Sequence, residues 1–555
     1  MGRVVIVVVP EDLKYVFAQF NPKVGDISYN KEKIIETIEY AETQEVDLVI
    51  FPELALSGYP PRDFLHYQSF HMAIEQALEA ITTVIETTHV ILGVPLFDTK
   101  KRLRNAAIVI DRTGIVYTYY KTLLPDYDVF DESRYFYPND NPGIVNICGI
   151  DIGLQICEDA WDYMWMHPLH VTDIQCSKGA ELIINISASP FTMTKAKNRL
   201  ELVKNHVQSN SIPYIYVNTV GCQDDLVFDG RSFVVAADQH LVFATPAFET
   251  GAFLFEGTLL KQSPSVPVLY YPDSPNDDIY HAIILNLQDY LEKSHLQPSL
   301  LVALSGGIDS ALTLTLASQA IGSDHVEAVY MPTKFSAEQS YKDSKKLCDN
   351  LGVRLRIVEI EDIRNLFSDK LHKIDGIKTT WSIADENIQA RIRSNIMMYL
   401  SNSFGSILVS TGNKSEIATG YCTLYGDTAG GKNILGDLYK TQIYELARWI
   451  NRNQEIIPPS IITRPPTAEL KEDQRDEDSL PPYEILDEIL ALFVDQYKGE
   501  DEIVSMGFDR PTVKRVIKLV LRNEFKRDQM VQSIKLSDKA FGSGRRFPIA
   551  SNYFP

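Results

Sequence analysis

Short apolar runs alternate with amphipathic stretches along almost the whole length of this 555-residue chain. A run that is apolar at consecutive positions is typical of a strand buried on both faces, and an amphipathic stretch is typical of a helix that covers such a strand. The clearest apolar runs are 47–51, 90–94, 106–110, 152–156, 182–186 and 300–304. The alternation predicts α/β units throughout, and no internal repeat of fixed period accompanies it.

A change in composition near the middle of the chain indicates a domain boundary. At roughly 150 residues per domain, the length allows about two to four domains. Residues 262–278 contain four prolines and the stretch Asp-Ser-Pro-Asn-Asp-Asp, which is typical of a linker. We therefore predict one domain over 1–261 and another over 279–555, with an amphipathic helix at about 279–294 opening the second.

Charge, cysteine content and hydropathy exclude several classes of protein. With 53 Lys and Arg against 74 Asp and Glu, the formal charge is −21, which argues against sequence-independent binding of nucleic acid. The six cysteines form no CxxC pair, so neither a disulfide framework nor a zinc ribbon is expected. The apolar run Val4–Val9 is too short for a membrane span or a signal core and predicts a buried strand. We expect a cytoplasmic protein without a membrane partner.

A glycine turn follows the predicted strand 300–304. Residues Ser305 to Ser310 read Ser-Gly-Gly-Ile-Asp-Ser and run into a helical stretch over 311–320. The two glycines allow the backbone to approach a ligand closely, and the start of the helix presents free N–H groups to an anion. The serines add hydroxyl donors, and Asp309 can bind a divalent cation. The P-loop pattern Gly-x4-Gly-Lys-Ser/Thr is absent, so we predict a phosphate site of another kind.

This turn resembles the nucleotide-binding motif of the N-type ATP pyrophosphatases, which activate a substrate as an adenylate and release pyrophosphate. Further motifs are similar, in their order, to those of the NAD synthetase family within that group. They lie at 387–391, 410–416, 419–431, 464–470, 478–483, 526–527 and 540–546. The resemblance covers nearly all of 279–555 and implies a Rossmann-like domain with a parallel sheet.

The resemblance to NAD synthetases implies a ligand for each motif. The ATP-binding residues would be Leu304, Ser305, Gly306, Gly307, Ile308, Asp309, Ser310, Ala311 and Thr411. Deamido-NAD would contact Asn387, Glu416, Asp427, Lys440 and Lys526. Mg²⁺ would bind Asp309 and Glu416. Taken alone, each lysine or aspartate is more often a surface charge than a ligand.

The stretch 465–482 is rich in proline and acidic residues and has two interpretations. One is a solvated loop, and the other is a loop that orders over a bound nucleotide. By the same resemblance, Thr467 would lie on the loop that covers the site.

In the first half, three polar residues lie next to predicted strands or a turn. Glu53 follows the strand 47–51, Lys121 precedes a turn, and Cys157 follows the strand 152–156. A thiol has a reference pKa of about 8.5, so a nucleophilic cysteine needs a base or a cation beside it. Glu53 could take the proton, and Lys121 could stabilise the oxyanion formed when the thiol attacks an amide. Taken alone, Cys157 is more often a buried hydrophobe, and the other two are more often solvated charges.

Together, in this order, the three residues resemble the Glu-Lys-Cys triad of the nitrilase superfamily. That resemblance covers about 16–260 and implies an α-β-β-α sandwich with amidase activity. The stretch 126–136 is similar to the glutaminase branch fused to NAD synthetases. In that branch, Tyr127 would line the glutamine pocket, and Ser189 and Lys195 would hold the amino-acid end of glutamine. Residues 1–15 precede the region of resemblance and have no assigned role.

The two resemblances together imply that ATP and ammonia from L-glutamine are used to amidate deamido-NAD, with an interior route for the ammonia. They also imply a homo-oligomer assembled through the synthetase domain, without fixing its size. Two other enzymes stay open as alternatives: an amidotransferase for another ATP-activated carboxylate, and a tRNA-modifying enzyme. The acidic charge and the lack of an RNA-binding stripe disfavour the second. A scaffold without activity is disfavoured because every triad and phosphate-loop side chain is present.

Overall fold

The computed structural model describes residues 13–162, 167, 169–261, 270–377, 380–467, 469–471, 474, 476 and 479–554. It divides into two compact units, Met1–Asp273 and Ser274–Pro555. The predicted strand Val4–Val9 lies outside the described residues. Within the described ranges, we find no helix with the length and apolar character that a bilayer crossing requires.

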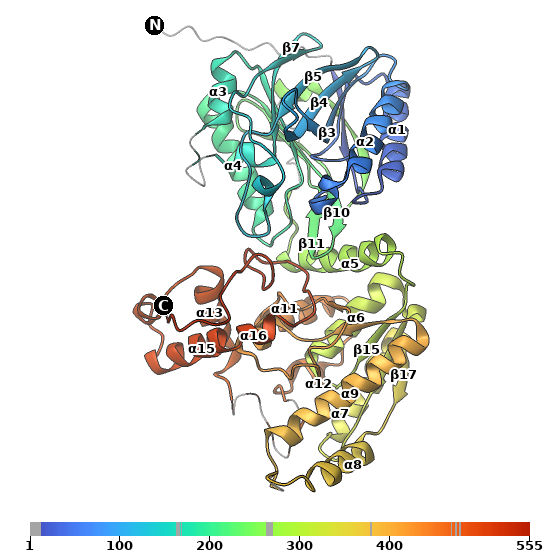
Figure 1. Cartoon of the computed structure of the whole chain (residues 1–555), viewed down its shortest axis with the longest axis vertical. Coiled ribbons are helices and arrows are strands. Elements are labelled where there is room, and N and C mark those ends of the chain that lie inside the picture. Colours follow the sequence, from blue (N-terminus) through green and yellow to red (C-terminus); the bar gives the residue numbers. More distant parts are fainter. Residues whose placement is uncertain are drawn as a thin grey trace. The chain divides into compact units, whose positions relative to one another are not determined.

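The first unit contains two six-stranded sheets and a separate hairpin (Figure 1). The first sheet runs in the order β14 (Gly251–Glu256), β1 (Lys14–Gln19), β2 (Leu48–Ile50), β3 (His89–Phe97), β4 (Leu103–Asp111) and β5 (Gly114–Tyr120). The second runs β13 (Leu241–Ala244), β12 (Phe233–Val235), β9 (Tyr214–Asn218), β8 (Leu182–Ser187), β7 (Ile150–Ile156) and β6 (Val145–Ile147). The hairpin pairs β10 (Val220–Gln223) with β11 (Leu226–Asp229).

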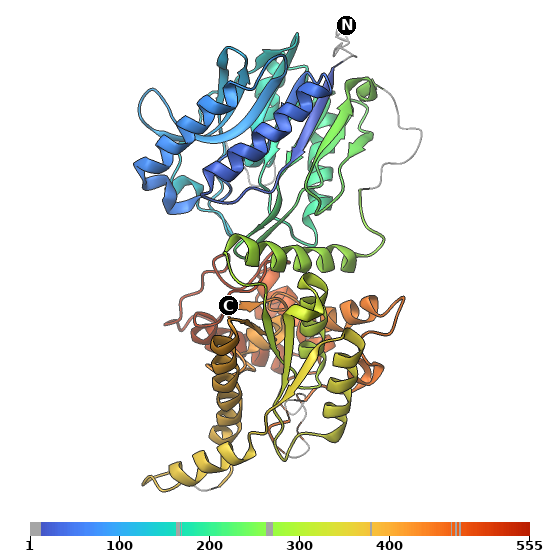
Figure 2. The same cartoon turned by 90° about the vertical axis from the view of Figure 1, so that its right-hand side faces the viewer.

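Two pairs of helices cover the outer faces of these sheets (Figure 1, Figure 2). The helices α1 (Ile27–Thr43) and α2 (Gln68–Thr82) share an apolar core with the first sheet. The helices α3 (Val171–Ser177) and α4 (Lys195–Asn210) lie on the second sheet, and α4 supplies most of the helical side chains in that core. The layers confirm the predicted α-β-β-α sandwich.

Alternate residues of a strand pack into two different cores in this sandwich. Tyr15 and Phe17 of β1 belong to the core between the sheets, together with Leu154 of β7. Val16 and Ala18 belong instead to the core beneath α1 and α2. Because successive side chains of a strand point to opposite faces, a strand covered on both faces must be apolar at consecutive positions. This is the physical origin of the apolar runs in the sequence.

Two boundaries differ from the sequence-based predictions. Lys14 and Tyr15, for which the sequence suggested no role, begin β1 and pair with β14. The helix α5 (Pro275–Lys293) begins before the expected position near 279. Ser274 caps it by accepting a hydrogen bond from a backbone N–H of the first turn, and proline suits the first helical position because it needs no donor. Residues 262–269 of the predicted linker lie outside the described part of the chain.

The second unit is built on a five-stranded parallel sheet. Its order is β17 (Arg354–Ile357), β16 (Val326–Tyr330), β15 (Leu300–Ala303), β18 (Ile407–Ser410) and β19 (Lys432–Asn433). The chain moves outward from β15 in one direction and then returns to β18 on its other side. In such sheets, ligands bind at the carboxyl ends of the strands on either side of this switch point. The Rossmann-like parallel sheet that the sequence predicted is confirmed.

Helices connect and surround the strands of this sheet (Figure 2). They are α6 (Ile308–Ile321), α7 (Glu338–Leu351), α8 (Glu361–Leu371), α9 (Ile383–Phe404), α10 (Lys414–Thr419), α11 (Lys440–Ile450), α12 (Pro459–Thr463), α13 (Tyr483–Leu490), α14 (Glu500–Ser505), α15 (Arg510–Arg522) and α16 (Glu524–Arg527). The helix α6 directly follows the glycine turn after β15, and α10 follows β18. Both helices therefore begin at the switch point.

The core between the two sheets of the first unit should respond strongly to loss of volume. Leu154 is fully buried in this core, whereas Leu254 on the edge strand β14 is 39% exposed. We expect Leu154→Ala to lower the local unfolding free energy by about 2–5 kcal/mol, because it leaves a cavity in a packed interior. Hydrogen exchange of the β7 and β8 amides in the intact chain measures this. The matched control Leu254→Ala should cost much less, and equal losses would contradict the assignment of this core.

Candidate active sites

Three strand ends of the first unit bring Glu53, Lys121 and Cys157 together. Glu53 follows β2, Lys121 follows β5, and Cys157 follows β7. The side chains of Glu53 and Lys121 are completely buried, and Nζ of the lysine lies 2.7 Å from Oε1 of the glutamate. The charges of both residues act on the Cys157 thiol. The structure therefore brings these three predicted residues into one buried site.

A second carboxylate, Glu132, belongs to the same site and was not identified from the sequence. Nζ of Lys121 donates to its Oε1 at 2.7 Å, and the hydroxyl of Tyr59 donates to the same oxygen at 2.9 Å. Asn105 donates to Glu53 at 2.7 Å and to Glu132 at 3.4 Å. Burial raises the pKa of Glu132 to about 7, while the charge of Lys121 opposes the rise and that of Glu53 adds to it.

The backbone around Cys157 is held in an unusual conformation. Cys157 has a φ of +44°, in the left-handed region, and begins a short 3-10 turn directly after β7. Asp159 in this turn accepts hydrogen bonds from the backbone N–H groups of Thr122 and Leu123, next to Lys121. Burial raises the pKa of the Cys157 thiol, and the negative charge of Glu53 adds to this effect. The resting thiol is therefore protonated and needs a base to become a nucleophile.

Polar groups that suit an amino acid lie around the turn at Cys157. The hydroxyl of Tyr127 donates to Glu158 at 2.9 Å, and Nε2 of His167 lies 3.2 Å from the same carboxylate. Lys195 begins α4, and its ammonium lies 3.9 Å from the centre of the Trp161 ring.

The third predicted glutamine-pocket residue, Ser189, is buried and follows β8. Its backbone N–H donates to Asn218 at 2.9 Å. Glu158 follows Cys157 directly in the chain, and this adjacency is the only sequence signal that could have identified it.

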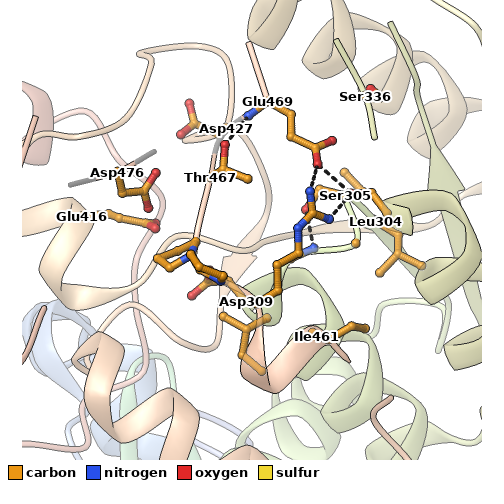
Figure 3. Close-up of a pocket in the computed structure, with 18 of the residues that line it drawn as sticks. Leu304, Ser305, Asp309, Ser336, Glu416, Asp427, Ile461, Thr467, Glu469 and Asp476 are labelled. Carbon is orange, nitrogen blue, oxygen red and sulfur yellow. Dashed lines mark hydrogen bonds and ion pairs between the residues drawn. The ribbon is translucent and has the colours of Figure 1, made fainter. Parts of the chain in front are cut away.

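A cavity of about 240 Å³ lies at the carboxyl ends of β15 and β16 in the second unit, and Glu416 of α10 also lines it. Leu304, Ser305, Gly306, Gly307, Ile308 and Asp309 line it, as the sequence predicted for ATP (Figure 3). Ser310 does not line the cavity, and its hydroxyl donates to the Gly307 carbonyl. Ala311 is fully buried in α6, and Thr411 follows β18 but does not line the cavity.

Gly306 shows why this turn needs a glycine. Its φ is +83°, and a Cβ at this position would lie 2.6 Å from the carbonyl oxygen of Ser340. Any other residue would be strained and would collide with backbone. The hydroxyl of Ser305 accepts from the N–H of Gly307 at 3.2 Å, which shapes the turn.

Charged side chains meet at the floor of the cavity. Lys440, which begins α11, pairs with Oδ2 of Asp309 and lies 3.4 Å from Oε1 of Glu416. Burial raises the pKa of Glu416 to about 8. The positive charge of Lys440 opposes this rise, and the negative charge of Asp309 adds to it. The two predicted metal ligands therefore lie close together, on either side of Lys440.

Three of the five predicted deamido-NAD contacts, Asp427, Asn387 and Lys526, belong to or contact the loop 420–427. Asp427 lines the cavity and accepts from the N–H of Thr423 at 2.6 Å. Thr423 also donates its hydroxyl to Asn387 at 2.9 Å. Lys526 donates to the carbonyls of Gly420 and Cys422. Asn387 and Lys526 do not line the cavity themselves, so the structure brings them to the loop next to it.

The stretch 465–482 contributes to the wall of the cavity. Pro465, Pro466, Thr467, Glu469 and Asp476 all line it (Figure 3). Arg464 pairs with Glu469 at 2.8 Å, and the hydroxyl of Ser340 donates to the same carboxylate at 2.6 Å. For the residues of this stretch that the structure describes, these contacts favour a loop that orders over the cavity. Residues 468, 472, 473, 475, 477 and 478 lie outside the described residues.

The charge of the cavity bears on the predicted metal. Its lining contains five carboxylates and three cationic side chains, so the wall carries an excess of negative charge. A triphosphate would meet repulsion here unless a cation accompanied it. Mg²⁺ is commonly held by one or two carboxylates together with substrate phosphates. Asp309 and Glu416 therefore fit a magnesium ion that arrives with ATP.

Comparison with known families assigns both units. The profile of the family described as carbon-nitrogen hydrolase matches residues 17–258, and that of the family described as NAD synthase matches 279–530. The fold and the two sites thus define a carbon-nitrogen hydrolase fused to an NAD synthase.

Individual relatives extend over almost the whole chain. The glutamine-dependent NAD(+) synthetase of Synechocystis sp. is 38% identical over 97% of this chain and 98% of the relative. The protein of the same name from Xylella fastidiosa is 40% identical over 98% and 99%. The solved structure of glutamine-dependent NAD+ synthetase from Acinetobacter baumannii, in complex with adenosine diphosphate, matches with a TM-score of 0.77 and 34% identity over 97% and 98%. The chain belongs to the glutamine-dependent NAD(+) synthetase family.

The raised pKa of Glu132 predicts a pH-dependent loss of stability. An acid with a higher pKa in the folded protein stabilises the fold most below its unfolded pKa, and this contribution is lost as the pH rises through the folded value. For Glu132 the window runs from 4.5 to about 7. As the pH rises across this window, wild type should therefore lose unfolding free energy relative to Glu132→Gln. Above the window, the difference between the two proteins should stay constant.

Thermal unfolding midpoints between about pH 5 and about pH 8 measure this difference. Glu75→Gln, on the exposed side of α2, is the matched control and should leave the profile unchanged. Parallel profiles for wild type and Glu132→Gln would contradict the burial of an ionisable group at this position.

Proposed function

We propose that this chain converts deamido-NAD, ATP, L-glutamine and water into NAD, AMP, pyrophosphate and L-glutamate. The observation that carries the proposal is the buried Glu53–Lys121 pair beside Cys157, in a chain whose second unit has a glycine-turn cavity at its switch point. One site can release nitrogen from an amide, and the other can activate a carboxylate that accepts it. We further propose that the reaction takes place in the cytoplasm. The full-length relatives favour this substrate over another ATP-activated carboxylate.

In the proposed glutaminase reaction, the Cys157 sulfur attacks the side-chain amide carbon of glutamine. Glu53 takes the thiol proton, and the ammonium of Lys121 stabilises the negative charge that develops on the amide oxygen. The proton passes to the leaving nitrogen, so ammonia departs and a thioester forms at Cys157. Water, deprotonated by Glu53, then cleaves the thioester and releases glutamate. Asn105 and Glu132 keep the base and the lysine in position.

The proposed glutamine pocket uses opposite charges for the two ends of an amino acid. We assign the α-ammonium to Glu158, which is buried and already accepts from Tyr127. Lys195, with Ser189, would hold the α-carboxylate. This division explains why a carboxylate lies directly beside the nucleophile, where its negative charge would otherwise only hinder formation of the thiolate.

In the proposed synthetase reaction, an oxygen of the nicotinate carboxylate attacks the α-phosphorus of ATP. Pyrophosphate leaves toward the turn Ser305–Asp309, whose N–H and hydroxyl groups suit its charge. Ammonia then attacks the carbonyl carbon of the acyl-adenylate, and AMP leaves with the bonding electrons. Lys440 would neutralise charge on the transferred phosphate, and Thr467 belongs to the loop that excludes water. A magnesium ion held by Asp309 and Glu416 would neutralise the phosphate oxygens.

The two halves of this mechanism predict separable losses. Cys157→Ala should abolish NAD formation driven by glutamine and preserve that driven by ammonium chloride, because only the first needs the thiol. Asp309→Ala should abolish both, because activation by ATP precedes either nitrogen source. Initial rates of NAD formation from deamido-NAD and ATP measure this.

Cys148→Ala is a matched control for the thiol, since Cys148 lies on the turn between β6 and β7. It should leave both rates unchanged. Loss of the ammonia-driven rate in a folded Cys157→Ala protein would contradict separate sites.

We also propose that the second unit binds a second copy of the chain through α8 and the segments next to it. Among the described residues, nine large apolar side chains between 357 and 383 are at least one-third exposed. They are Ile357, Ile363, Leu366, Phe367, Leu371, Ile374, Ile377, Trp381 and Ile383. Ile363, Leu366, Phe367 and Leu371 recur at the three- and four-residue spacing of one face of α8. A contiguous exposed apolar face is typical of an interface. A two-fold axis would bury the same surface on both copies.

A charge on this surface should weaken self-association. Leu366 and Met506 are both 58% exposed, but only Leu366 lies on the proposed interface. We expect Leu366→Asp to shift the molar mass measured by sedimentation toward the monomer, because an aspartate would lose its hydration at the interface. Met506→Asp should leave the mass unchanged. An unchanged mass for Leu366→Asp would contradict this interface.

A further inference from the structure

Asn413 lies between the two carboxylates at the floor of the cavity and contacts both of them. It is fully buried, directly before α10. Its Nδ2 donates to Oδ1 of Asp309 at 3.0 Å, and its Oδ1 accepts from the backbone N–H of Glu416 at 2.9 Å. Its own backbone N–H lies 3.4 Å from Oε2 of Glu416.

Lys440 completes a closed arrangement on the opposite side. It pairs with the other oxygen of Asp309, Oδ2, and with the other oxygen of Glu416, Oε1. Each carboxylate therefore contacts Asn413 through one oxygen and Lys440 through the other. Because a carboxylate oxygen has two lone-pair positions, each group keeps acceptor sites for a cation after these bonds are made. The arrangement fixes both planes and leaves the ligand positions available.

Only an asparagine meets the demands at position 413. The N–H of Glu416 needs an acceptor, as the start of a helix does in general, and Asp309 needs a donor. An amide supplies one of each on a short side chain. An aspartate would satisfy the helix but would oppose Asp309 with a like charge. A serine would satisfy the helix but would be too short to reach Asp309 as well.

We propose that Asn413 is a positioning residue for the adenylation step: it holds the Asp309 carboxylate in the orientation that binds the metal of the metal–ATP complex. The inference rests on the proposed function, in which Asp309 and Glu416 bind that metal. Asn413 acts through Asp309 and does not itself touch the reacting atoms. Loss of its amide leaves the carboxylate attached to Lys440 alone and free to turn toward the lysine.

The alternative is that Asn413 only begins α10. The two roles separate cleanly, because serine and aspartate both cap helices well and neither can bridge to Asp309 as asparagine does. Asn413→Ser and Asn413→Asp are therefore the informative variants. Asn451→Ser is the matched control, because Asn451 ends α11, bonds the backbone of Ile456 and Ile457, and does not line the cavity.

The experiment has a binding measurement and a kinetic measurement on the full chain. Calorimetric titration with ATP at varied Mg²⁺, in the absence of deamido-NAD, measures metal-dependent binding without turnover. Ammonia-driven NAD formation gives kcat, the KM for ATP and the Mg²⁺ concentration at half-maximal rate. Thermal midpoints and glutamine hydrolysis by the first unit report whether each variant is folded.

We expect Asn413→Ser and Asn413→Asp to lower kcat by about 10- to 100-fold, the loss typical of small misplacements of catalytic groups. Asn413→Ser should require more Mg²⁺ for ATP binding and for half-maximal rate, while Asn451→Ser should not. The thermal midpoint and glutamine hydrolysis should stay close to wild type. An unchanged Mg²⁺ dependence in both Asn413 variants would overturn the inference. So would a loss of kcat that only follows a lowered thermal midpoint, as a purely structural residue such as Asn451 would give.

Failure of the proposed function gives a different result. If wild type bound ATP with Mg²⁺ but formed no NAD from deamido-NAD and ammonia, the assignment of the substrate would be wrong. The calorimetric comparison of wild type with Asn413→Ser would still decide the role of Asn413.

Discussion

Each unit of this protein is organised around a buried lysine that lies between two carboxylates. The groups are Lys121 with Glu53 and Glu132, and Lys440 with Asp309 and Glu416. Removal of such charges from water is costly, and close pairing is needed to offset the cost. The lysine therefore fixes two acidic side chains at once, and with them the loops from which they come. Reactive groups held in this way need little rearrangement when charge develops on a substrate.

The strands explain why these groups meet. Glu53, Lys121 and Cys157 are far apart in the sequence, yet each lies at most three residues beyond the end of a strand of the sandwich. In the second unit, the turn after β15 and the start of α10 after β18 meet because the parallel sheet reverses its order between these strands. The apolar strands thus provide rigid supports, and the polar residues occupy the first positions beyond them, where the backbone is free to turn.

The predictable part of the fold and sites came from local patterns with a clear physical meaning. The apolar runs became β2, β3, β4, β7, β8 and β15, because burial on both faces demands consecutive apolar residues. The glycine turn was recognisable because its conformation excludes other residues. By contrast, the sequence predicted no role for Asn105, Glu132 or Asn413, although the last two lie within stretches that resemble known families. Their importance depends on partners that lie 27, 52 and 104 positions away along the chain, which no local pattern encodes.

The sequence alone determined the α/β architecture and the glycine turn, since both rest on residue type and short-range order. It indicated the Glu-Lys-Cys set only through its resemblance to the nitrilase superfamily. Tertiary structure decided which charges are paired, which hydroxyls face the cavity and which side chains serve only the packing. Ser310 and Ala311 lie in the expected motif and yet stay behind the turn, whereas Glu158 and Glu469 enter the sites without having been expected. The reason is that pairing and burial depend on distances between strand ends, and those distances exist only after the sheets have formed.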